Sequence, residues 1–187
     1  MPDVLVIGGG PAGLSAALFT AKNGLETVVY DADATWMHKA HLFNYLGIRS
    51  IDGGEFLTIA RGQTADRGAT IQTDTTVTGV DQHNDGFVVE TRDETVEAPY
   101  LVLATGANRD LAESLGCEFT EEGVVSVDVS METSIPDCYA TGAMVRVEEW
   151  QAIISAGDGA AAALNILSKE KCEHFHDFDT PADVPEF

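Results

Sequence analysis

The apolar positions at the start of the chain follow first a strand pattern and then a helical one. Residues 4–7 form an apolar run typical of a strand buried on both faces. After a glycine-rich turn, residues 14–22 are rich in alanine and leucine and have helical spacing. Residues 27–30 then predict a second strand, which ends at Asp31. Strand, tight turn, helix and strand in this order predict the beginning of a parallel α/β sheet.

The turn after the first strand contains a glycine pattern with a known physical role. Gly8, Gly10 and Gly13 have the spacing G-x-G-x-x-G. In this pattern the first glycine makes the turn, the second lets the backbone approach a pyrophosphate, and the third lets helix and strand pack closely. Asp31, about 20 residues further on, can accept hydrogen bonds from the hydroxyl groups of an adenosine ribose. Together with the anion-binding N–H groups at the helix start, these residues predict a site for a dinucleotide that contains ADP.

The middle of the chain alternates between helical and strand patterns. Residues 32–52 have no clear period but carry several large side chains, and we expect this loop to border the ligand. Residues 54–67 predict a helix. An antiparallel meander is predicted from four short β-rich runs, at residues 70–72, 75–80, 87–91 and 95–96. Residues 100–103 form another continuous apolar strand, which ends in a small-residue turn at residues 104–106.

The C-terminal part predicts a further strand, a small-residue turn and a long helix. The strand ends at the turn around Gly142, and residues 147–169 have apolar side chains at spacings of three and four that predict one helix. Gly157 and Gly159 lie inside this helix, where each costs about 1 kcal/mol relative to alanine, so we expect another element to approach it closely. With Ala162 they match G-x-G-x-x-A, but no strand precedes them, and we predict no second nucleotide site here.

The charge of the chain is strongly negative. Its 187 residues include 31 acids and 10 lysines and arginines, which gives a formal net charge of −21. This charge disfavours nucleic acids and anionic membranes as partners. The acids are scattered, as on a protein from a halophilic, salt-accumulating cytosol, where molar salt reduces the Debye length to about 3 Å. Since no signal-like leader precedes the first strand and no apolar run is long enough to span a membrane, we expect a cytoplasmic protein.

We expect a single domain at residues 1–168, followed by an acidic, solvated tail at residues 169–187 that binds no metal ion. The cysteines Cys117, Cys138 and Cys172 are odd in number and form no C-x-x-C motif. This favours free thiols in a reducing compartment. Cys138 lies on a predicted strand and is expected to be a buried thiol rather than a redox group.

Several motifs together resemble the flavin-binding parts of thioredoxin reductase-like proteins, which are FAD-dependent pyridine nucleotide-disulfide oxidoreductases. The motifs are GGGPAG with its downstream acid, NYLGI with GGEFL, YLVLATGA, IPDCYATGAM and WQAIISAGDGAAAAL. They follow the family's order over nearly the whole chain, to about residue 168. The resemblance implies an α/β fold, a three-layer Rossmann-like FAD-binding domain with a parallel sheet, helices on one face and a β-meander on the other.

The resemblance also implies which residues contact FAD. The pyrophosphate would be held by Gly8, Gly10, Pro11, Ala12 and Gly13. The adenosine would meet Asp31 at its ribose and Val77 at its adenine. The diphosphate, ribose and ribityl groups would pass near Ala104, Thr105, Gly106, Gly142 and Ala143, and the isoalloxazine near Asn44, Gln151 and Ala152. No catalytic side chain is identified, because a bound flavin itself carries the electrons.

Three features depart from the family pattern. Only one glycine fingerprint is credible, so the family's inserted NAD(P)H-binding domain is missing. The redox C-x-x-C that normally lies in that insert is missing as well. Where the family usually has an aspartate that contacts the ribityl chain, this chain has Ala143. The lost hydrogen bond costs about 1.5 to 3 kcal/mol of FAD affinity.

Two functions therefore stay open. The first is a minimal FAD-dependent oxidoreductase that receives electrons from free NAD(P)H or from a ferredoxin-like protein. The second is a non-catalytic module that binds FAD or another dinucleotide and acts through a partner or as a dimer, and homodimerisation is implied by the resemblance alone. A domain that binds NAD is disfavoured, because a doubly wound NAD domain would continue with alternating strands and helices in place of the meander.

Overall fold

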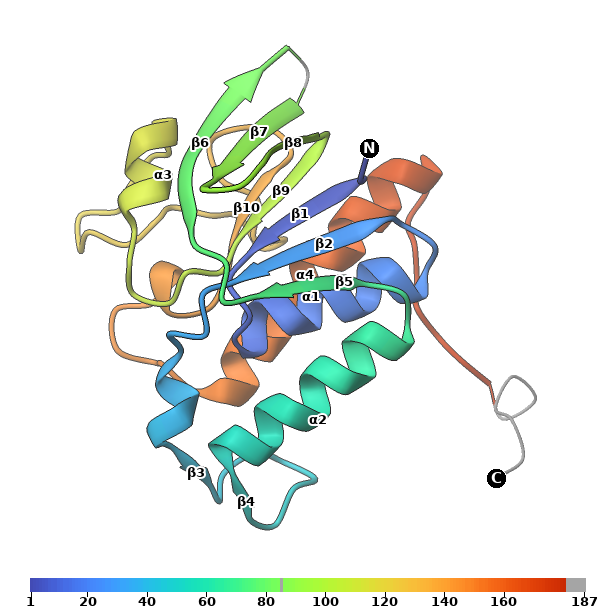
Figure 1. Cartoon of the computed structure of the whole chain (residues 1–187), viewed down its shortest axis with the longest axis vertical. Coiled ribbons are helices and arrows are strands. Elements are labelled where there is room, and N and C mark those ends of the chain that lie inside the picture. Colours follow the sequence, from blue (N-terminus) through green and yellow to red (C-terminus); the bar gives the residue numbers. More distant parts are fainter. Residues whose placement is uncertain (85, 181–187) are drawn as a thin grey trace.

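The protein is built in three layers around a parallel sheet (Figure 1). The computed structural model describes residues 1–84 and 86–180. Five parallel strands form the sheet in the order β10-β9-β1-β2-β5. Their bounds are Val4–Ile7 for β1, Thr27–Asp31 for β2, Thr70–Thr73 for β5, Tyr100–Leu103 for β9 and Cys138–Ala140 for β10. The three-layer α/β architecture predicted above is confirmed.

Helices cover one face of the sheet and a meander covers the other (Figure 1). The helices on the first face are α1 (Pro11–Lys22), α2 (Gly53–Asp66) and α4 (Ala152–Lys171). The meander consists of β6 (Val77–His83), β7 (Gly86–Thr91) and β8 (Thr95–Ala98), and α3 (Asp110–Leu115) packs against β6. Short elements in the loops are η1 (Trp36–Lys39), β3 (His41–Leu42), β4 (Ile51–Asp52) and η2 (Gly142–Val145). Within the described residues, no helix has the length and apolar character needed to cross a membrane.

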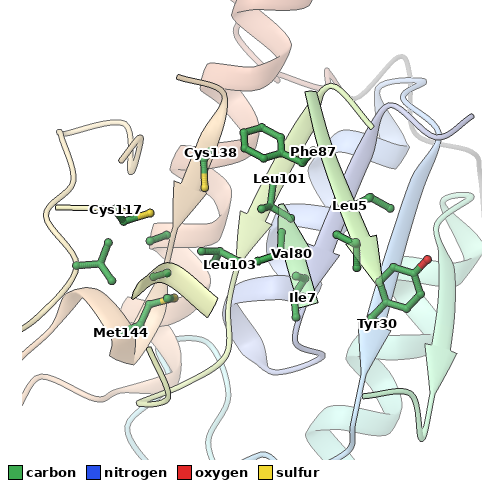
Figure 2. Close-up of a cluster of buried hydrophobic side chains, with 14 of the residues drawn as sticks. Leu5, Ile7, Tyr30, Val80, Phe87, Leu101, Leu103, Cys117, Cys138 and Met144 are labelled. Carbon is green, nitrogen blue, oxygen red and sulfur yellow. The ribbon is translucent and has the colours of Figure 1, made fainter. Parts of the chain in front are cut away.

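The two faces of β1 explain why its sequence is apolar throughout. Successive side chains of a strand point to opposite faces of its sheet. Val4 and Val6 pack in a core with the alanines of α1 and α4. Leu5 and Ile7 pack in a second core with Phe87 of the meander, and Figure 2 shows these side chains between the two layers. All four residues of β1 are buried, so no position along the strand can be polar.

We predicted that residues 70–72 belong to the meander, and this was wrong. It is β5, the edge strand of the parallel sheet, with Val28 opposite Thr70 in the register. The reason lies in the connection: α2 crosses over between β2 and β5 and returns the chain in the same direction. Only β6, β7 and β8 form the antiparallel meander.

The last helix begins later than the prediction of residue 147. Its first residue is Ala152, and Gln151 is the N-cap with extended backbone angles. The N–H of Trp150 bonds to the carbonyl of Glu148, and its indole Nε1 donates to the carbonyl of Arg146, so this segment is held in a non-helical turn. The apolar side chains before residue 152 therefore do not belong to the helical stripe.

The C-terminal segment contacts the end of α1. Lys22 donates to Asp177 at 2.6 Å and to Asp179 at 2.7 Å. The helix α4 itself continues to Lys171, past the predicted boundary at residue 168. Residues 181–187 of the predicted tail lie outside the described residues, as does Asp85 in the predicted turn between β6 and β7.

One of the two glycines in α4 allows close contact between helices. A Cβ on Gly159 would lie 2.0 Å from the carbonyl oxygen of Ala12, so α4 meets the backbone of α1 at its first turn. The expected close approach is confirmed here. A Cβ on Gly157 would meet nothing within 4 Å, and for this residue the expectation was wrong.

We predict opposite effects on stability for these two glycines. Gly159→Ala should lower the free energy of unfolding by at least about 2 kcal/mol, because the two helices must move apart. Gly157→Ala is the matched control and should raise it by about 0.5–1 kcal/mol, since alanine is the better helix former and the position is exposed. Denaturant unfolding in molar salt measures both. Equal effects of the two substitutions would contradict the packing described here.

Candidate functional site

Turns that follow β1, β2, β9 and β10 meet at one edge of the sheet, because the strands are parallel and adjacent. Ligands of open α/β folds bind outside this carboxyl edge. The predicted residues lie as follows: Gly8 and Gly10 in the turn after β1, Pro11, Ala12 and Gly13 in the first turn of α1, Asp31 at the end of β2, Val77 at the start of β6, Ala104, Thr105 and Gly106 after β9, and Gly142 and Ala143 in η2 after β10. The strand order thus gathers most of the predicted residues along one edge.

Two glycines of the fingerprint are required by contacts inside the protein. Gly8 has a φ of +115°, and a Cβ there would lie 2.3 Å from the carbonyl oxygen of Ala104. A Cβ on Gly13 would lie 1.9 Å from the carbonyl oxygen of Gly8. The first turn, the start of α1 and the end of β9 therefore share one tight backbone contact. This agrees with the roles expected for the first and third glycines.

Gly10 differs, because no contact within residues 1–84 and 86–180 requires a glycine there. Its φ is −83°, which any residue can adopt, and a Cβ would meet only the Thr35 hydroxyl, at 3.5 Å. Gly10 is also the N-cap of α1 and supplies no capping side chain, and Pro11 occupies the next position. The start of a helix carries N–H groups that the helix itself does not satisfy. An open space beside such a helix start can accept a phosphate group.

The carboxylate of Asp31 lies directly over the glycine-rich turn. A Cβ on Gly9 would lie 2.1 Å from both Cγ and Oδ2 of Asp31, so the middle glycine of the three is needed for this contact. The Asp31 side chain is only 3% exposed. The N–H of Asp33 donates to Oδ1 of Asp31 at 2.9 Å, and the carbonyl of Asp31 accepts from Thr75, just before Val77.

Arg61 of α2 binds this buried carboxylate. Its Nε and Nη2 donate to Oδ2 of Asp31 at 3.1 Å and 2.6 Å, and Nη2 also bonds to Asp33. The hydrogen bond from Arg61, with a second contact from His38, lowers the pKa of the Asp33 carboxyl group. Sequence analysis missed Arg61. The available signal was an arginine on the helix after Asp31, in a chain with only 10 lysines and arginines.

Arg109 joins the two small-residue turns. It lies after the turn at residues 104–106, and its Nε donates to the carbonyl of Met144 at 3.0 Å. Its Nη2 lies 3.4 Å from the carbonyl oxygens of Ala143 and Arg146. The guanidinium group thus binds the carbonyls at the end of η2 and fixes one turn against the other. This residue too was missed by sequence analysis.

Two distant loops come together beside the start of α4. The Asn44 side chain donates to Oε1 of Gln151 at 2.8 Å, although the two residues are 107 positions apart. Trp150, next to Gln151 in the sequence, contacts Trp36 in the other loop, with ring centroids 5.2 Å apart. The structure therefore brings together Asn44, Gln151 and the first residue of α4, Ala152, which the sequence had predicted to lie at the same end of a ligand.

A partly buried ion pair joins the first turns of the same helix to the segment before it. Asp158 of α4 is 6% exposed, and its Oδ2 accepts from Nε of Arg146 at 3.3 Å. A second contact joins Nη2 and Oδ1 at 2.5 Å. The hydrogen bond to Asp158 raises the pKa of Arg146, so the guanidinium group stays charged. The pair ties the segment after η2 to α4.

The layers and the glycine-rich edge define a Rossmann-like α/β protein. The model of the pyridine nucleotide-disulphide oxidoreductase family matches residues 2–107 and residues 54–157. The chain belongs to this family.

Several known proteins are similar to the chain. The solved structure of a thioredoxin reductase from Gloeobacter violaceus superposes with a TM-score of 0.87 at 21% identity, covering 96% of this chain and 99% of that one. A ferredoxin-flavin thioredoxin reductase from Clostridium acetobutylicum gives a TM-score of 0.79 at 19% identity, over 92% and 99% of the two chains. A ferredoxin–NADP reductase from Levilactobacillus brevis is 28% identical over 112 residues, which are 56% of this chain and 34% of that protein. The chain spans about a third or less of the curated relatives it matches.

We predict that Arg61→Ala destabilises the fold by about 2 kcal/mol, because it leaves the Asp31 carboxylate buried without its cation. The estimate is below the range for fully buried pairs, since the Arg61 side chain is 22% exposed. Arg67→Ala removes the same charge from an exposed position at the end of α2 and should cost less than about 1 kcal/mol. Denaturant unfolding compares the variants, and equal losses would show that Arg61 contributes only as a surface charge.

Proposed function

We propose that the chain binds FAD along the carboxyl edge of the sheet and is a flavin-dependent oxidoreductase of its family. The observation that carries the proposal is the space beside Gly10. The other glycines of the turn, at positions 8, 9 and 13, are explained by contacts within the protein, and Gly10 is not. No described contact within the protein requires glycine at position 10, which is the N-cap of α1 and has no capping side chain. A glycine at such a position fits the close approach of a pyrophosphate. The resemblance to thioredoxin reductase-like flavoproteins supports FAD as the dinucleotide.

The residues of the edge fit the parts of FAD in order. Gly10, Ala12 and Gly13 would face the pyrophosphate, and Asp31 the ribose hydroxyls. Arg61 would hold the Asp31 carboxylate in place for those hydroxyls, since two of its nitrogen atoms bind Oδ2. The pair of Asn44 and Gln151 would face the polar edge of the isoalloxazine. When bound, FAD supplies the electron-transfer chemistry, and the side chains bind and orient it.

The electron donor is proposed to be free NAD(P)H or a ferredoxin-like protein. Between β9 and β10 the chain has α3 and loops, where the resemblance places an inserted NAD(P)H-binding domain. The proposed donor therefore comes from solution or from another protein. The similar proteins include one named as a ferredoxin-flavin thioredoxin reductase and one as a ferredoxin–NADP reductase. The net charge of −21 supports a cytoplasm rich in salt as the place of action.

A second candidate is a non-catalytic module that holds FAD for a partner or within a dimer. It is favoured by Ala143, which stands where the family usually has an acid, and by the single glycine fingerprint. Binding of FAD does not separate the two candidates. Reduction of the bound flavin does, because a module needs no accessible donor site.

Gly10→Val tests the proposed pyrophosphate position. The valine side chain would fill the space next to the start of α1, so we predict that the dissociation constant for FAD rises at least tenfold, about 1.4 kcal/mol. Stability without FAD should change little, because a Cβ at this position meets only the Thr35 hydroxyl, at an ordinary contact distance of 3.5 Å. Gly62→Val introduces the same side chain at an open, exposed position of α2 and serves as the control. Fluorescence titration with FAD measures the affinity, and equal affinity in the two variants would contradict the assignment.

Anaerobic reduction separates the oxidoreductase from the module. We predict that the visible absorption of the FAD-loaded protein in molar salt bleaches on addition of NADPH, NADH or reduced ferredoxin. Chemical reduction by dithionite is the positive control, because it reduces the flavin whether or not a donor site exists. Bleaching by dithionite but by none of the three donors would support the module instead.

A further inference from the structure

Two cysteines that are far apart in the sequence contact each other in the core on the meander side of the sheet. Cys117 follows the end of α3, and Cys138 begins β10. Their exposed fractions are 6% and 0%. Both side chains belong to one buried hydrophobic cluster, and in Figure 2 the two sulfur atoms point toward one another. Neither cysteine is part of a C-x-x-C motif, so the pair could not be read from the sequence.

Backbone hydrogen bonds hold the two cysteines side by side through a third segment. The N–H of Glu118, next to Cys117, donates to the Ser134 hydroxyl at 2.9 Å. The N–H of Thr133 donates to the carbonyl of Cys138 at 2.8 Å. Residues 133 and 134 therefore hydrogen-bond both to the backbone beside Cys117 and to the backbone of Cys138. The close approach of the thiols is therefore set by the fold around them.

The surroundings make the two thiols chemically different. The hydrogen bond from Cys138, helped by the Thr133 hydroxyl, lowers the pKa of the Cys117 thiol to about 7 in spite of its burial. The same hydrogen bond and burial raise the pKa of Cys138. Cys117 is thus the member of the pair that becomes a thiolate, and Cys138 keeps its proton. A thiolate is the nucleophile in thiol oxidation, and a neighbouring thiol can then complete a disulfide.

We propose that Cys117 and Cys138 are a redox-active thiol pair, which a small hydroperoxide oxidises to a reversible intrachain disulfide. The Cys117 thiolate attacks the peroxide oxygen, the O–O bond breaks, and hydroxide or alkoxide leaves, which gives a sulfenic acid at Cys117. The Cys138 sulfur then attacks the Cys117 sulfur, and the hydroxyl group leaves with the Cys138 proton as water. The two sulfurs lose two electrons in total, and the peroxide gains them. Two thiols of a reductant reverse the change.

The third cysteine provides an internal control. Cys172 caps the end of α4 and is exposed. Since α4 covers the helical face of the sheet and the thiol pair lies on the meander side, the sheet separates Cys172 from the pair (Figure 1). The location of the pair also matters, because β10 leads directly into the turn at Gly142. A disulfide would attach this strand covalently to the segment after α3.

Peptide mapping of the folded protein tests the proposal. Trypsin leaves both cysteines in the peptide of residues 110–146 and Cys172 in the peptide of residues 172–187. After brief treatment of the reduced protein with hydrogen peroxide, and alkylation under denaturing conditions, we expect the first peptide to carry no alkylated cysteine and to lack two hydrogens. Dithiothreitol should restore two alkylation sites. Met131 and Met144 lie in the same peptide, and their oxidation changes its mass but not the number of alkylated cysteines, so this number is the readout.

Several outcomes would overturn the proposal. One is that peptide 110–146 still carries two alkylated cysteines when Cys172 is already oxidised. Another is a disulfide from Cys117 or Cys138 to Cys172. A third is irreversible oxidation of the pair without a disulfide. Cys138→Ser should abolish the link and leave a sulfenic acid at Cys117 that dimedone captures, whereas Cys172→Ser should keep the link. If Cys138→Ser does not fold, the peptide map of the unsubstituted chain alone decides.

Discussion

The structure depends on one backbone contact, in which Gly8 meets the carbonyl of Ala104 and Gly13 meets the carbonyl of Gly8. Neither contact leaves room for a Cβ atom, so the first turn, the start of α1 and the end of β9 form one rigid unit. The helix α4 joins this unit at Ala12 through Gly159. Close packing of backbone on backbone directs the start of α1 toward the open side of the sheet edge. The space beside Gly10 is what this arrangement leaves free.

Electrostatics at the edge differ from those of the rest of the surface. The chain has 31 acids and 10 lysines and arginines, yet arginines at this edge bind buried acids or main-chain carbonyls. Arg61 binds Asp31, and Arg146 binds Asp158, so each carboxylate taken out of water has a cation. Arg109 binds only main-chain carbonyls in the contacts described, and it holds the two small-residue turns together. Most of the other acids among the described residues are exposed, and molar salt screens their repulsion.

Local patterns predicted the fold well where the decisive contacts are local. The first strand, the fingerprint turn, the helix and Asp31 were all predicted, because turn, helix start and strand follow each other within 31 residues. The placement of residues 70–73 was wrong, since a short polar strand carries no mark of the partner it pairs with. The start of α4 was wrong because Trp150 bonds to a carbonyl outside the helix. Arg61 and Arg109 were missed because they bind distant segments: Arg61 binds Asp31, 30 positions away, and Arg109 binds the carbonyl of Met144, 35 positions away.

The measurement that tests the central claim most directly is thermal unfolding in molar salt with saturating FAD, ADP or FMN. If the ADP part of the ligand lies against Gly10 and Asp31, as proposed, FAD and ADP should both raise the unfolding midpoint. At 100 times its dissociation constant, FAD should contribute about 2.7 kcal/mol, roughly 5–10 °C. FMN, which lacks the adenosine half, should have little effect. A shift with FMN equal to that with FAD, or no shift with either FAD or ADP, would contradict the account.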